Sequence, residues 1–471
     1  MSLTQIFILA IAAILLRQLG KQRALGLMAC SAFVLYWLQP VQSPVTLTFW
    51  LPTFTLLLIV FVWRFLFSGD NLDWKQNSIS LVVLSAIVMF IGANRYLQLE
   101  ELFTVETPRL QWIGITVAVM LSLAVRFLRF EKVQFKLYAV AIVGLLALLV
   151  FTKLPSAQTM LLERISDLRG KESSIGWVSL SWLGFSYIAF RLIHTIVDKQ
   201  AGRLRFIALP EYVNYVIFFP SIVAGPIDRL ERFTRDLHTA VLLDSRGWVD
   251  AGTRLFTGLF KKFVLADGLA WIALNEYFAR DVDSVGWLWL LLYAYSMRIY
   301  FDFSGYTDIA IGLGLLLGVR LPENFAAPYL KTNLTLFWNS WHMTLTQWFR
   351  SYLFNPLTRV LRSDLSLPSY IVIFITQILT MVTIGLWHGI TVNFVYWGLW
   401  HGVGLFIQNR WSSFLRGRVA EDQMTRPIQH QLDFINIFLT FNYVSLGWLF
   451  FMLPTPTLAW QTMLKMFGVV L

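Results

Sequence analysis

The stretches FWNSWHMTLTQWFR, at residues 337–350, and GLWHGITVNFVYWGLWHG, at residues 385–402, decide the fold of this chain. They hold three of its six histidines, His342, His388 and His401, each among apolar residues. Apolar runs of this kind are typical of helices inside a bilayer, where the rare polar side chains mark functional sites. The two stretches therefore predict a membrane fold with a polar site inside it.

Helical periodicity divides residues 334–352 into two faces. The apolar face holds Leu334, Phe337, Trp341, Leu345, Trp348 and Tyr352. The polar face holds Thr335, Asn339, His342, Thr346 and Arg350. We expect one helix whose polar face extends about 22 Å, most of the ~30 Å core of a bilayer. Such a face would line a path between the two sides of the membrane.

The pentapeptide Gly-Leu-Trp-His-Gly occurs twice, at residues 385–389 and 398–402. Its glycines are four residues apart, a spacing that lets helices approach closely in a membrane. If one helix carried both copies, His388 and His401 would lie roughly 20 Å apart and would not serve one small site. A lone histidine on an apolar helix is usually a core residue with satisfied hydrogen bonds. We keep that interpretation for His401, and we expect His342 and His388 to be functional.

The composition excludes an ordinary soluble domain. Of the 471 residues, 57% are hydrophobic, 16% are aromatic and only 14% are charged, and the mean hydropathy is +0.62. Soluble domains carry about 25% charged residues. The chain is therefore predicted to be an all-α, polytopic integral membrane protein. Its net charge of +11 fits loops that face anionic lipid, and we expect no nucleic-acid partner.

Apolar segments recur along the whole chain, with no linker between them that would divide it into domains. They lie near residues 3–16, 24–38, 46–68, 77–94, 110–127, 137–152, 176–197, 370–386, 391–408 and 432–453. Together with shorter and broken segments, they predict about eleven to thirteen transmembrane or re-entrant helices. The first run is followed by basic residues instead of being preceded by them, which favours a spanning helix over a cleaved signal peptide. We expect a single integral membrane domain over residues 1–471.

Several reaction classes are excluded by missing motifs. The single cysteine, Cys30, rules out disulfides within the chain, CxxC redox chemistry and cysteine-rich metal sites. The G-x-S-x-G, H-E-x-x-H and P-loop motifs do not occur, so a self-contained serine hydrolase, zinc protease or nucleotide triphosphatase is not expected. We expect neither a metal site nor a permanently bound cofactor.

The loop charges predict an orientation. With the N-terminus outside, the basic loops at residues 17–23, 126–136 and 199–205 lie in the cytoplasm. The acidic loop at residues 100–106 then lies outside, as the positive-inside rule favours.

Three other features interrupt the apolar pattern. Pro220, Gly225 and Pro226 break any helix within FFPSIVAGPIDR, so this segment either re-enters the membrane or turns at its surface. Arg298 and Asp302 are spaced as a helical ion pair, which would hold the bundle together. Asp308 has no evident local partner and is expected to face a cavity.

Five stretches together resemble the membrane-bound O-acyltransferase family, in its bacterial branch of alginate O-acetylation and D-alanyl transfer proteins. They are FFPSIVAGPIDR (218–229), IYFDFSGYTDIAIGLG (299–314), LPENFAAPYL (321–330), FWNSWHMTLTQWFRSYLFNPL (337–357) and GLWHGITVNFVYWGLWHG (385–402). The resemblance is dense over a core of about residues 181–410, and before it lie N-terminal helices at about residues 1–180.

The resemblance implies a ring of helices around a central cavity, and acyl transfer in the inner membrane of a bacterium. The donor would be an acyl-CoA or a carrier-protein thioester on the cytoplasmic side, with acetyl as the expected group. The acceptor would be an extracytoplasmic glycan or a partner acyltransferase. His388, in the matching WHG motif, would be the general base, and His342, in the matching WH motif, would position or polarise the acyl carbonyl. Acyl transfer from a thioester needs such a base and an oxyanion donor.

The substrates are expected to contact residues on the polar face and near the two histidines. These residues are Asp308, Asn339, Trp341, Thr346, Arg350, Trp387 and Asn393. Three alternatives remain open: D-alanyl transfer to a cell-envelope polymer, a transporter or channel whose polar face lines a permeation path, and a structural anchor for glycan-export proteins.

Overall fold

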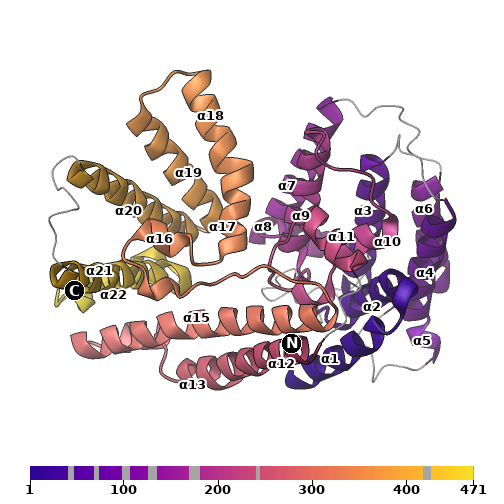
Figure 1. Cartoon of the computed structure of the whole chain (residues 1–471), viewed down its shortest axis with the longest axis horizontal. Coiled ribbons are helices and arrows are strands. Elements are labelled where there is room, and N and C mark those ends of the chain that lie inside the picture. The colour runs from indigo at the N-terminus through magenta and orange to yellow at the C-terminus, as the bar shows by residue number, and fades with distance from the viewer. Residues whose placement is uncertain are drawn as a thin grey trace. The chain divides into compact units, whose positions relative to one another are not determined.

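The computed structural model describes residues 1–40, 47–67, 74–97, 107–125, 135–168, 181–239, 244–416 and 426–469. All regular elements in these ranges are helices, which confirms the all-α prediction (Figure 1). The chain forms two compact units, Met1–Arg254 with Ala310–Leu321, and Leu255–Ile309 with Pro322–Leu471. The single domain stays a prediction.

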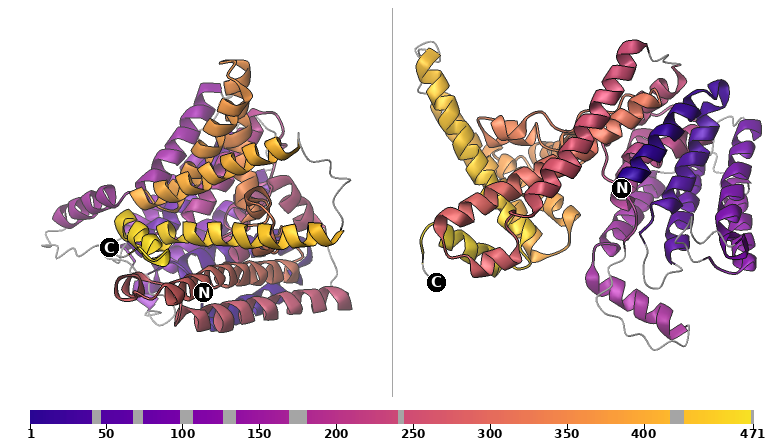
Figure 2. Two further views of the ribbon diagram at one scale, coloured as in Figure 1. Left: turned by 90° about the vertical axis from the view of Figure 1, so that its left-hand side faces the viewer. Right: turned by 90° about the horizontal axis from the view of Figure 1, so that it is seen from below.

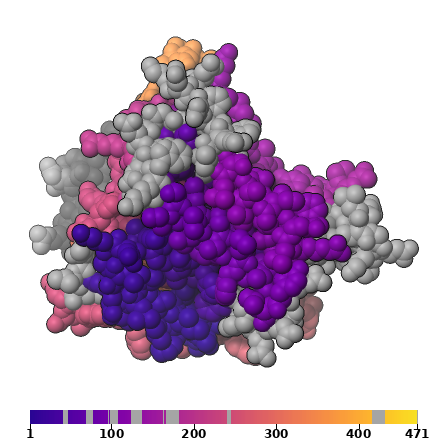
Figure 3. Space-filling view, turned by 90° about the vertical axis from the view of Figure 1, so that its right-hand side faces the viewer, coloured from indigo at the N-terminus to yellow at the C-terminus, as the bar shows by residue number. Residues whose placement is uncertain are grey.

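The first unit contains the N-terminal helices. They are α1 (Leu3–Arg17), α2 (Arg23–Trp37), α3 (Leu47–Leu66), α4 (Trp74–Gly92), α5 (Asn94–Leu97), α6 (Leu110–Val125), α7 (Phe135–Phe151), α8 (Pro155–Leu168), α9 (Phe185–Gln200), α10 (Leu209–Val216), α11 (Leu230–His238) and most of α12 (Ser245–Leu259). On the face shown in Figure 3, α1 and α2 (indigo) lie beside α4 and α6 (purple). Three of these helices expose large apolar side chains, for example Phe7, Val82 and Trp112, as is expected of helices that face lipid.

Buried amides and carbonyls join the helices of this unit. Asn214 on α10 donates to the Ala24 carbonyl at 2.7 Å, and the Leu209 amide donates to Asn77 Oδ1 at 2.9 Å. The Trp63 indole donates to the Ile207 carbonyl at 2.9 Å. Because an unpaired polar group in an apolar interior is costly, these bonds fix how α2, α3, α4 and α10 pack.

The FFPSIVAGPIDR segment is held by one buried guanidinium. Arg191 on α9 is 1% exposed and donates to the carbonyls of Val216, at 2.8 Å, and Ser221, at 3.0 Å. Gly184 precedes α9 with φ of +61°, and a Cβ there would meet the Ile222 carbonyl oxygen at 2.1 Å. The segment is thus packed inside the first unit. Whether it re-enters the membrane or turns at its surface stays a prediction.

The second unit contains the elements that carry the two quoted stretches. Its helices are α13 (Asp267–Ala270), α14 (Glu276–Asp281), α15 (Val285–Leu316, to Ile309), α16 (Leu334–Trp338), α17 (Met343–Phe349), α18 (Asn355–Ser363), α19 (Ser369–His388), α20 (Val392–Arg416), α21 (Arg426–Met452) and α22 (Pro456–Met466). Two π-helical segments, Phe260–Ala266 and Arg350–Phe354, interrupt the α-helices. In the left view of Figure 2, α20 and α21 are the two long yellow rods.

The repeated glycines bring α19 and α20 together. A Cβ on Gly385 would lie 2.1 Å from the Phe394 carbonyl oxygen, and one on Gly398 would lie 2.5 Å from the Val382 Cα. The predicted close approach at the glycines is confirmed. The two copies of the pentapeptide lie on different helices, because α19 ends at His388 and α20 begins at Val392.

Length and apolar composition identify three helices in the described ranges that could cross a membrane: Leu47–Leu66, Ser369–His388 and Gln431–Met452. A fourth span is possible if Lys136–Phe151 and Pro155–Leu161, bent by 87°, act as one. The larger number of eleven to thirteen segments stays a prediction. The basic residues 126–134 and the acidic residues 100–106, on which the predicted orientation partly depends, lie outside the described residues.

Candidate active site

The predicted continuous helix over residues 334–352 is wrong. The chain breaks between α16 and α17, and His342 adopts a left-handed conformation with φ of +42°. The segment 324–326 takes the hydrogen bonds that a continuous helix would use: Met343 N–H donates to the Asn324 carbonyl at 2.9 Å, and Ala326 N–H donates to the Ser340 carbonyl at 3.0 Å. The two short helices therefore start and stop around this pairing.

His342 is buried at the break. It is 3% exposed, and its Nδ1 lies 3.1 Å from Oδ1 of Asn324, which is fully buried. The ring of Phe303 meets it edge-on at 4.7 Å between centroids. The contact with Asn324 and the ring of Phe303 thus help to fix the plane of the imidazole.

His388 is half-buried and is the last residue of α19. Aromatic rings surround its imidazole, with centroids at 4.6 Å for Trp387, 4.9 Å for Phe451 and 5.7 Å for Trp397. Trp387 also approaches the His342 ring, at 6.3 Å. The two histidines come from separate elements and share an aromatic neighbour.

One small cavity of about 60 Å³ is lined by both histidines. Trp341 and Thr346, two of the residues predicted to contact substrate, also line it. The cavity is large enough for one or two reacting groups at most. The fold therefore brings His342 and His388, the two histidines predicted to be functional, to one cavity.

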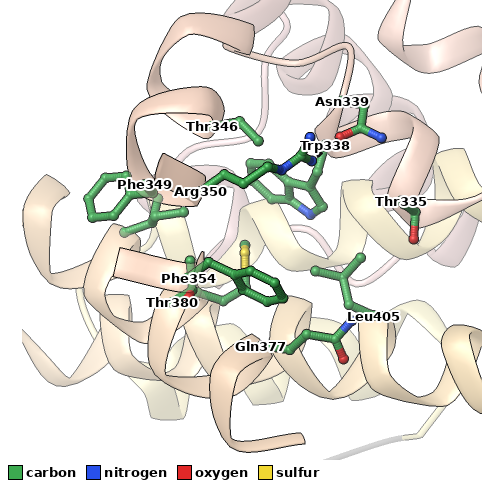
Figure 4. Close-up of a pocket in the computed structure, with 12 residues that line it drawn as sticks. Thr335, Trp338, Asn339, Thr346, Phe349, Arg350, Phe354, Gln377, Thr380 and Leu405 are labelled. Carbon is green, nitrogen blue, oxygen red and sulfur yellow. Dashed lines mark hydrogen bonds between the residues drawn. The ribbon is translucent and has the colours of Figure 1, made fainter. Parts of the chain in front are cut away.

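A second cavity of about 190 Å³ shares Trp338, Thr346 and Ile384 with the first, so the two adjoin (Figure 4). Its walls come from α16, α17, the π-helical segment after α17, α19 and α20. Asn339 and Arg350, both predicted to contact substrate, line it and are hydrogen-bonded to each other. The polar face of the supposed single helix is therefore preserved as a cavity lining, although the helix is broken.

Three polar atoms at the wall of this cavity are buried without a hydrogen-bond partner among the residues that the structure describes. They are Trp338 Nε1, Gln377 Oε1 and Thr380 Oγ1. Buried polar groups are nearly always paired, with protein, water or a ligand. A donor, an acceptor and a hydroxyl at one cavity are therefore suited to an incoming polar group.

Two predicted substrate contacts lie elsewhere. Asp308 is 4% exposed and pairs with Lys261 at 2.7 Å, and neither described cavity is lined by it. Asn393 is 6% exposed and its amide donates to the Leu453 carbonyl, which gives it a structural contact. Trp387, the remaining one, lies against both histidines.

The predicted ion pair between Arg298 and Asp302 is wrong. Asp302 pairs with Lys262 instead, across a close helix crossing at which a Cβ on Gly258 would meet the Gly305 carbonyl oxygen at 2.7 Å. The crossing brings a lysine nearer to Asp302 than the arginine one turn away on its own helix.

His401 is a core residue, as predicted, but its hydrogen bonds are not satisfied. It is fully buried between the rings of Trp397, at 4.9 Å, and Trp338, at 5.1 Å. Neither ring nitrogen has a hydrogen-bond partner among the described residues. It lines neither of the two described cavities.

Sequence reasoning missed Asn324, Trp338, Gln377 and Thr380. Asn324 stands in LPENF, a stretch that was noted only for its resemblance to a family, and its contact with His342 joins residues 18 positions apart. Gln377 and Thr380 are isolated polar residues in an apolar helix, a signal that could have been used.

The profile of the membrane-bound O-acyltransferase family matches residues 32–453. The chain belongs to the membrane-bound O-acyltransferase family. It is accordingly an integral membrane protein.

Curated relatives come from several bacteria. A teichoic acid D-alanyltransferase of Streptococcus thermophilus is 31% identical over 283 residues, 58% of this chain and 68% of that protein. A probable alginate O-acetylase of Azotobacter vinelandii is 34% identical over 61% of this chain and 54% of its own length. For a peptidoglycan O-acetyltransferase of Helicobacter pylori the identity is 33%, over 51% and 43%. The match thus spans about two thirds of the first relative and about half of the other two.

Proposed function

We propose that this member of the membrane-bound O-acyltransferase family moves an acetyl group from a cytoplasmic thioester toward an extracytoplasmic glycan or partner protein, in the inner membrane of a bacterium. One observation carries the proposal: two histidines from separate elements line a single small cavity. Relatives named as O-acetylating alginate or peptidoglycan support acetyl as the group.

The chemistry moves one proton, which one imidazole takes up and then passes on. An acceptor hydroxyl attacks the thioester carbonyl, its proton passes to His388, the carbon–sulfur bond breaks, and the thiol leaves with a proton from the same imidazole. Aromatic rings pack around the imidazole of His388 and hold it at the cavity. His388 is thus the general base of the proposed reaction, and His342 acts beside it.

The larger cavity is proposed to hold the polar part of a substrate next to the histidines. Its unpartnered donor, acceptor and hydroxyl match the donor and acceptor pattern of an amide or a sugar hydroxyl. The acyl donor, which enters as a substrate, is an acyl-CoA or a carrier-protein thioester.

The test is substitution of each histidine in the purified full chain. His388→Ala is expected to lower the transfer rate by about 10² to 10⁴ with an unchanged elution profile and thermal midpoint in detergent. His401→Met, which leaves the cavity lining intact, is the matched control. Transfer near the wild-type rate in His388→Ala would remove the proposal. The expected loss of transfer in His388→Ala would exclude a channel or a passive anchor, since neither needs a proton acceptor.

D-alanyl transfer is the second candidate. It is favoured by the teichoic acid D-alanyltransferase of Streptococcus thermophilus, because the match covers 68% of that protein and only 54% and 43% of the two O-acetylating relatives. Acetyl-CoA and a D-alanyl carrier thioester, offered separately to the same preparation, discriminate between the two. Transfer of D-alanine without transfer of acetate would establish the second candidate.

A further inference from the structure

Asn324 is the polar neighbour of His342, and its side-chain oxygen has an unambiguous orientation. Three polar groups lie within hydrogen-bond distance of Oδ1: the Thr344 backbone N–H at 3.2 Å and the Thr344 hydroxyl at 2.8 Å, which both donate to it, and Nδ1 of His342 at 3.1 Å. A backbone N–H can only donate, so it must face the oxygen of the amide and not the nitrogen. Flipping the Asn324 amide would set two donors against each other.

The fixed oxygen of Asn324 determines which ring nitrogen of His342 carries the hydrogen. A carbonyl oxygen only accepts, so Nδ1 must be the donor in this contact. In a neutral imidazole the other nitrogen then carries the lone pair, because the partner of one ring nitrogen sets the state of the other. Nε2 of neutral His342 therefore accepts hydrogen bonds and cannot donate them.

We propose that Asn324 is a positioning residue, which holds His342 in the tautomer protonated at Nδ1 and so makes it a hydrogen acceptor at the cavity. The family resemblance implied that His342 positions or polarises the acyl carbonyl, and the proposal differs from the second of these roles. A carbonyl oxygen needs a donor, and neutral His342 in this tautomer has none to offer at Nε2. The part of the proposal that concerns transfer rests on the proposed function.

Burial makes the arrangement persistent. Asn324 is 0% exposed, Thr344 is 4% exposed and His342 is 3% exposed, so water does not compete for these bonds. The backbone reinforces the side chain, because the Asn324 carbonyl also accepts from Met343 N–H at 2.9 Å. Asn324 is thus hydrogen-bonded to the two residues that follow His342, through its side chain and through its backbone carbonyl.

The tautomer itself is measured first. Nitrogen-15 solid-state spectra of histidine-labelled protein in lipid bilayers distinguish the two ring nitrogens, and the His342 signals are those lost in His342→Asn. We expect Nδ1 to be protonated in the wild type, and a mixture of tautomers in Asn324→Leu. Thr344→Val is the matched control, since it removes a hydrogen bond to the same oxygen but leaves the one from His342. Its spectrum should match the wild type.

Two results would overturn the proposal: protonated Nε2 in the wild type, or an unchanged tautomer in Asn324→Leu. Neither depends on activity. If the tautomer is as expected while His388→Ala transfers normally, the proposed function fails and the positioning role of Asn324 stands.

The pH profile then tests the acceptor role. Asn324→Asp keeps an acceptor at Nδ1 and stabilises the charged imidazole, so Nε2 loses its lone pair at higher pH. If His342 acts as an acceptor, the acid limb of the profile should move to higher pH, and Asn324→Leu should lose about 10²-fold in rate through misplacement of the ring. An acid limb that stays in place, or activity that rises at low pH, would contradict the role. A purely structural residue would not move the limb.

Discussion

At the scale of single residues, the sequence identified the two cavity histidines but not the residue that orients one of them. His342 stood out because it lies on the polar face of residues 334–352, and His388 because it lies between glycines in the WHG motif. Asn324 did not, because only the folded chain brings it to His342. Local pattern identifies which groups can react, while tertiary contacts determine in which state they do so.

His401 offers a prediction about stability. An imidazole with two unpaired nitrogens in a buried aromatic environment costs free energy, and Met has a similar volume without the polar atoms. His401→Met should therefore unfold at the same temperature as the wild type or a higher one, with transfer retained. Differential scanning of the two proteins in one detergent measures this. A lowered midpoint would indicate a hydrogen bond to a group that the described residues do not show.

For a substitution of Thr380 we expect retained stability together with weaker substrate binding. Its hydroxyl lines the larger cavity and has no hydrogen-bond partner in the described part of the chain, so Thr380→Val should leave the thermal midpoint unchanged or raise it. If a substrate group bonds to this hydroxyl, the loss of one hydrogen bond, at roughly 0.5 to 1.5 kcal/mol, raises KM by about 2- to 13-fold. Thr383→Val is the control, since Thr383 is on the same helix and is bonded to the Leu379 carbonyl. An unchanged KM would remove Thr380 from the substrate site.

At the scale of helices, periodicity predicted the polar face of residues 334–352 correctly and its continuity wrongly. Thr335, Asn339, Thr346 and Arg350 all line one cavity, as one face would. The break at His342 depends on backbone bonds to residues 324–326, which no pattern within 334–352 contains. Glycine spacing was a better guide, because the close approach of α19 and α20 is a property of the residues themselves.

The glycine contact can be tested by adding one methyl group. Gly385→Ala places a Cβ 2.1 Å from the Phe394 carbonyl oxygen, so α19 and α20 must separate, at a cost of about 1–3 kcal/mol. Gly286→Ala, at a helical glycine with no atom within 4 Å of its Cβ, should be neutral or stabilising. Thermal midpoints in detergent compare the two. Equal midpoints would show that the helices can move apart freely.

The lysine–aspartate pair between the π-helical segment and α15 gives a second test at this scale. The side chains of Asp308 and Lys261 are 6% and 24% exposed, so removing one leaves a charge with little water. Asp308→Leu alone should cost roughly 3–5 kcal/mol, and Asp308→Leu with Lys261→Met should recover much of it. A double-mutant cycle on thermal stability measures the coupling. Additive effects would show that the pair is screened by solvent.

At the scale of the whole molecule, composition predicted an all-helical membrane protein, and its helices and family confirm it. The number of spans and their direction depend on loop charges and on a bilayer, neither of which packing determines. Several helices are shorter than the roughly 20 residues that cross a bilayer. Their place in the membrane therefore cannot be derived from hydropathy alone.

The orientation is tested with cysteines after Cys30→Ser. Arg203, with a side chain 71% exposed, reports on the basic side, and Glu101 reports on the acidic loop. An impermeant thiol reagent added to intact cells should label Glu101→Cys and not Arg203→Cys, because basic loops stay in the cytoplasm. The reverse labelling would invert the proposed direction of transfer.

The left-handed backbone at His342 has a consequence for sequence variation. A non-glycine residue in that conformation is strained by about 1–3 kcal/mol, and asparagine, aspartate and glycine tolerate it best. In a library of all substitutions at this position, sorting for folded protein should enrich those three and deplete valine, isoleucine and threonine. Sorting the same library for transfer should return histidine. The residues that fold best and the residue that transfers best would therefore differ at this one position.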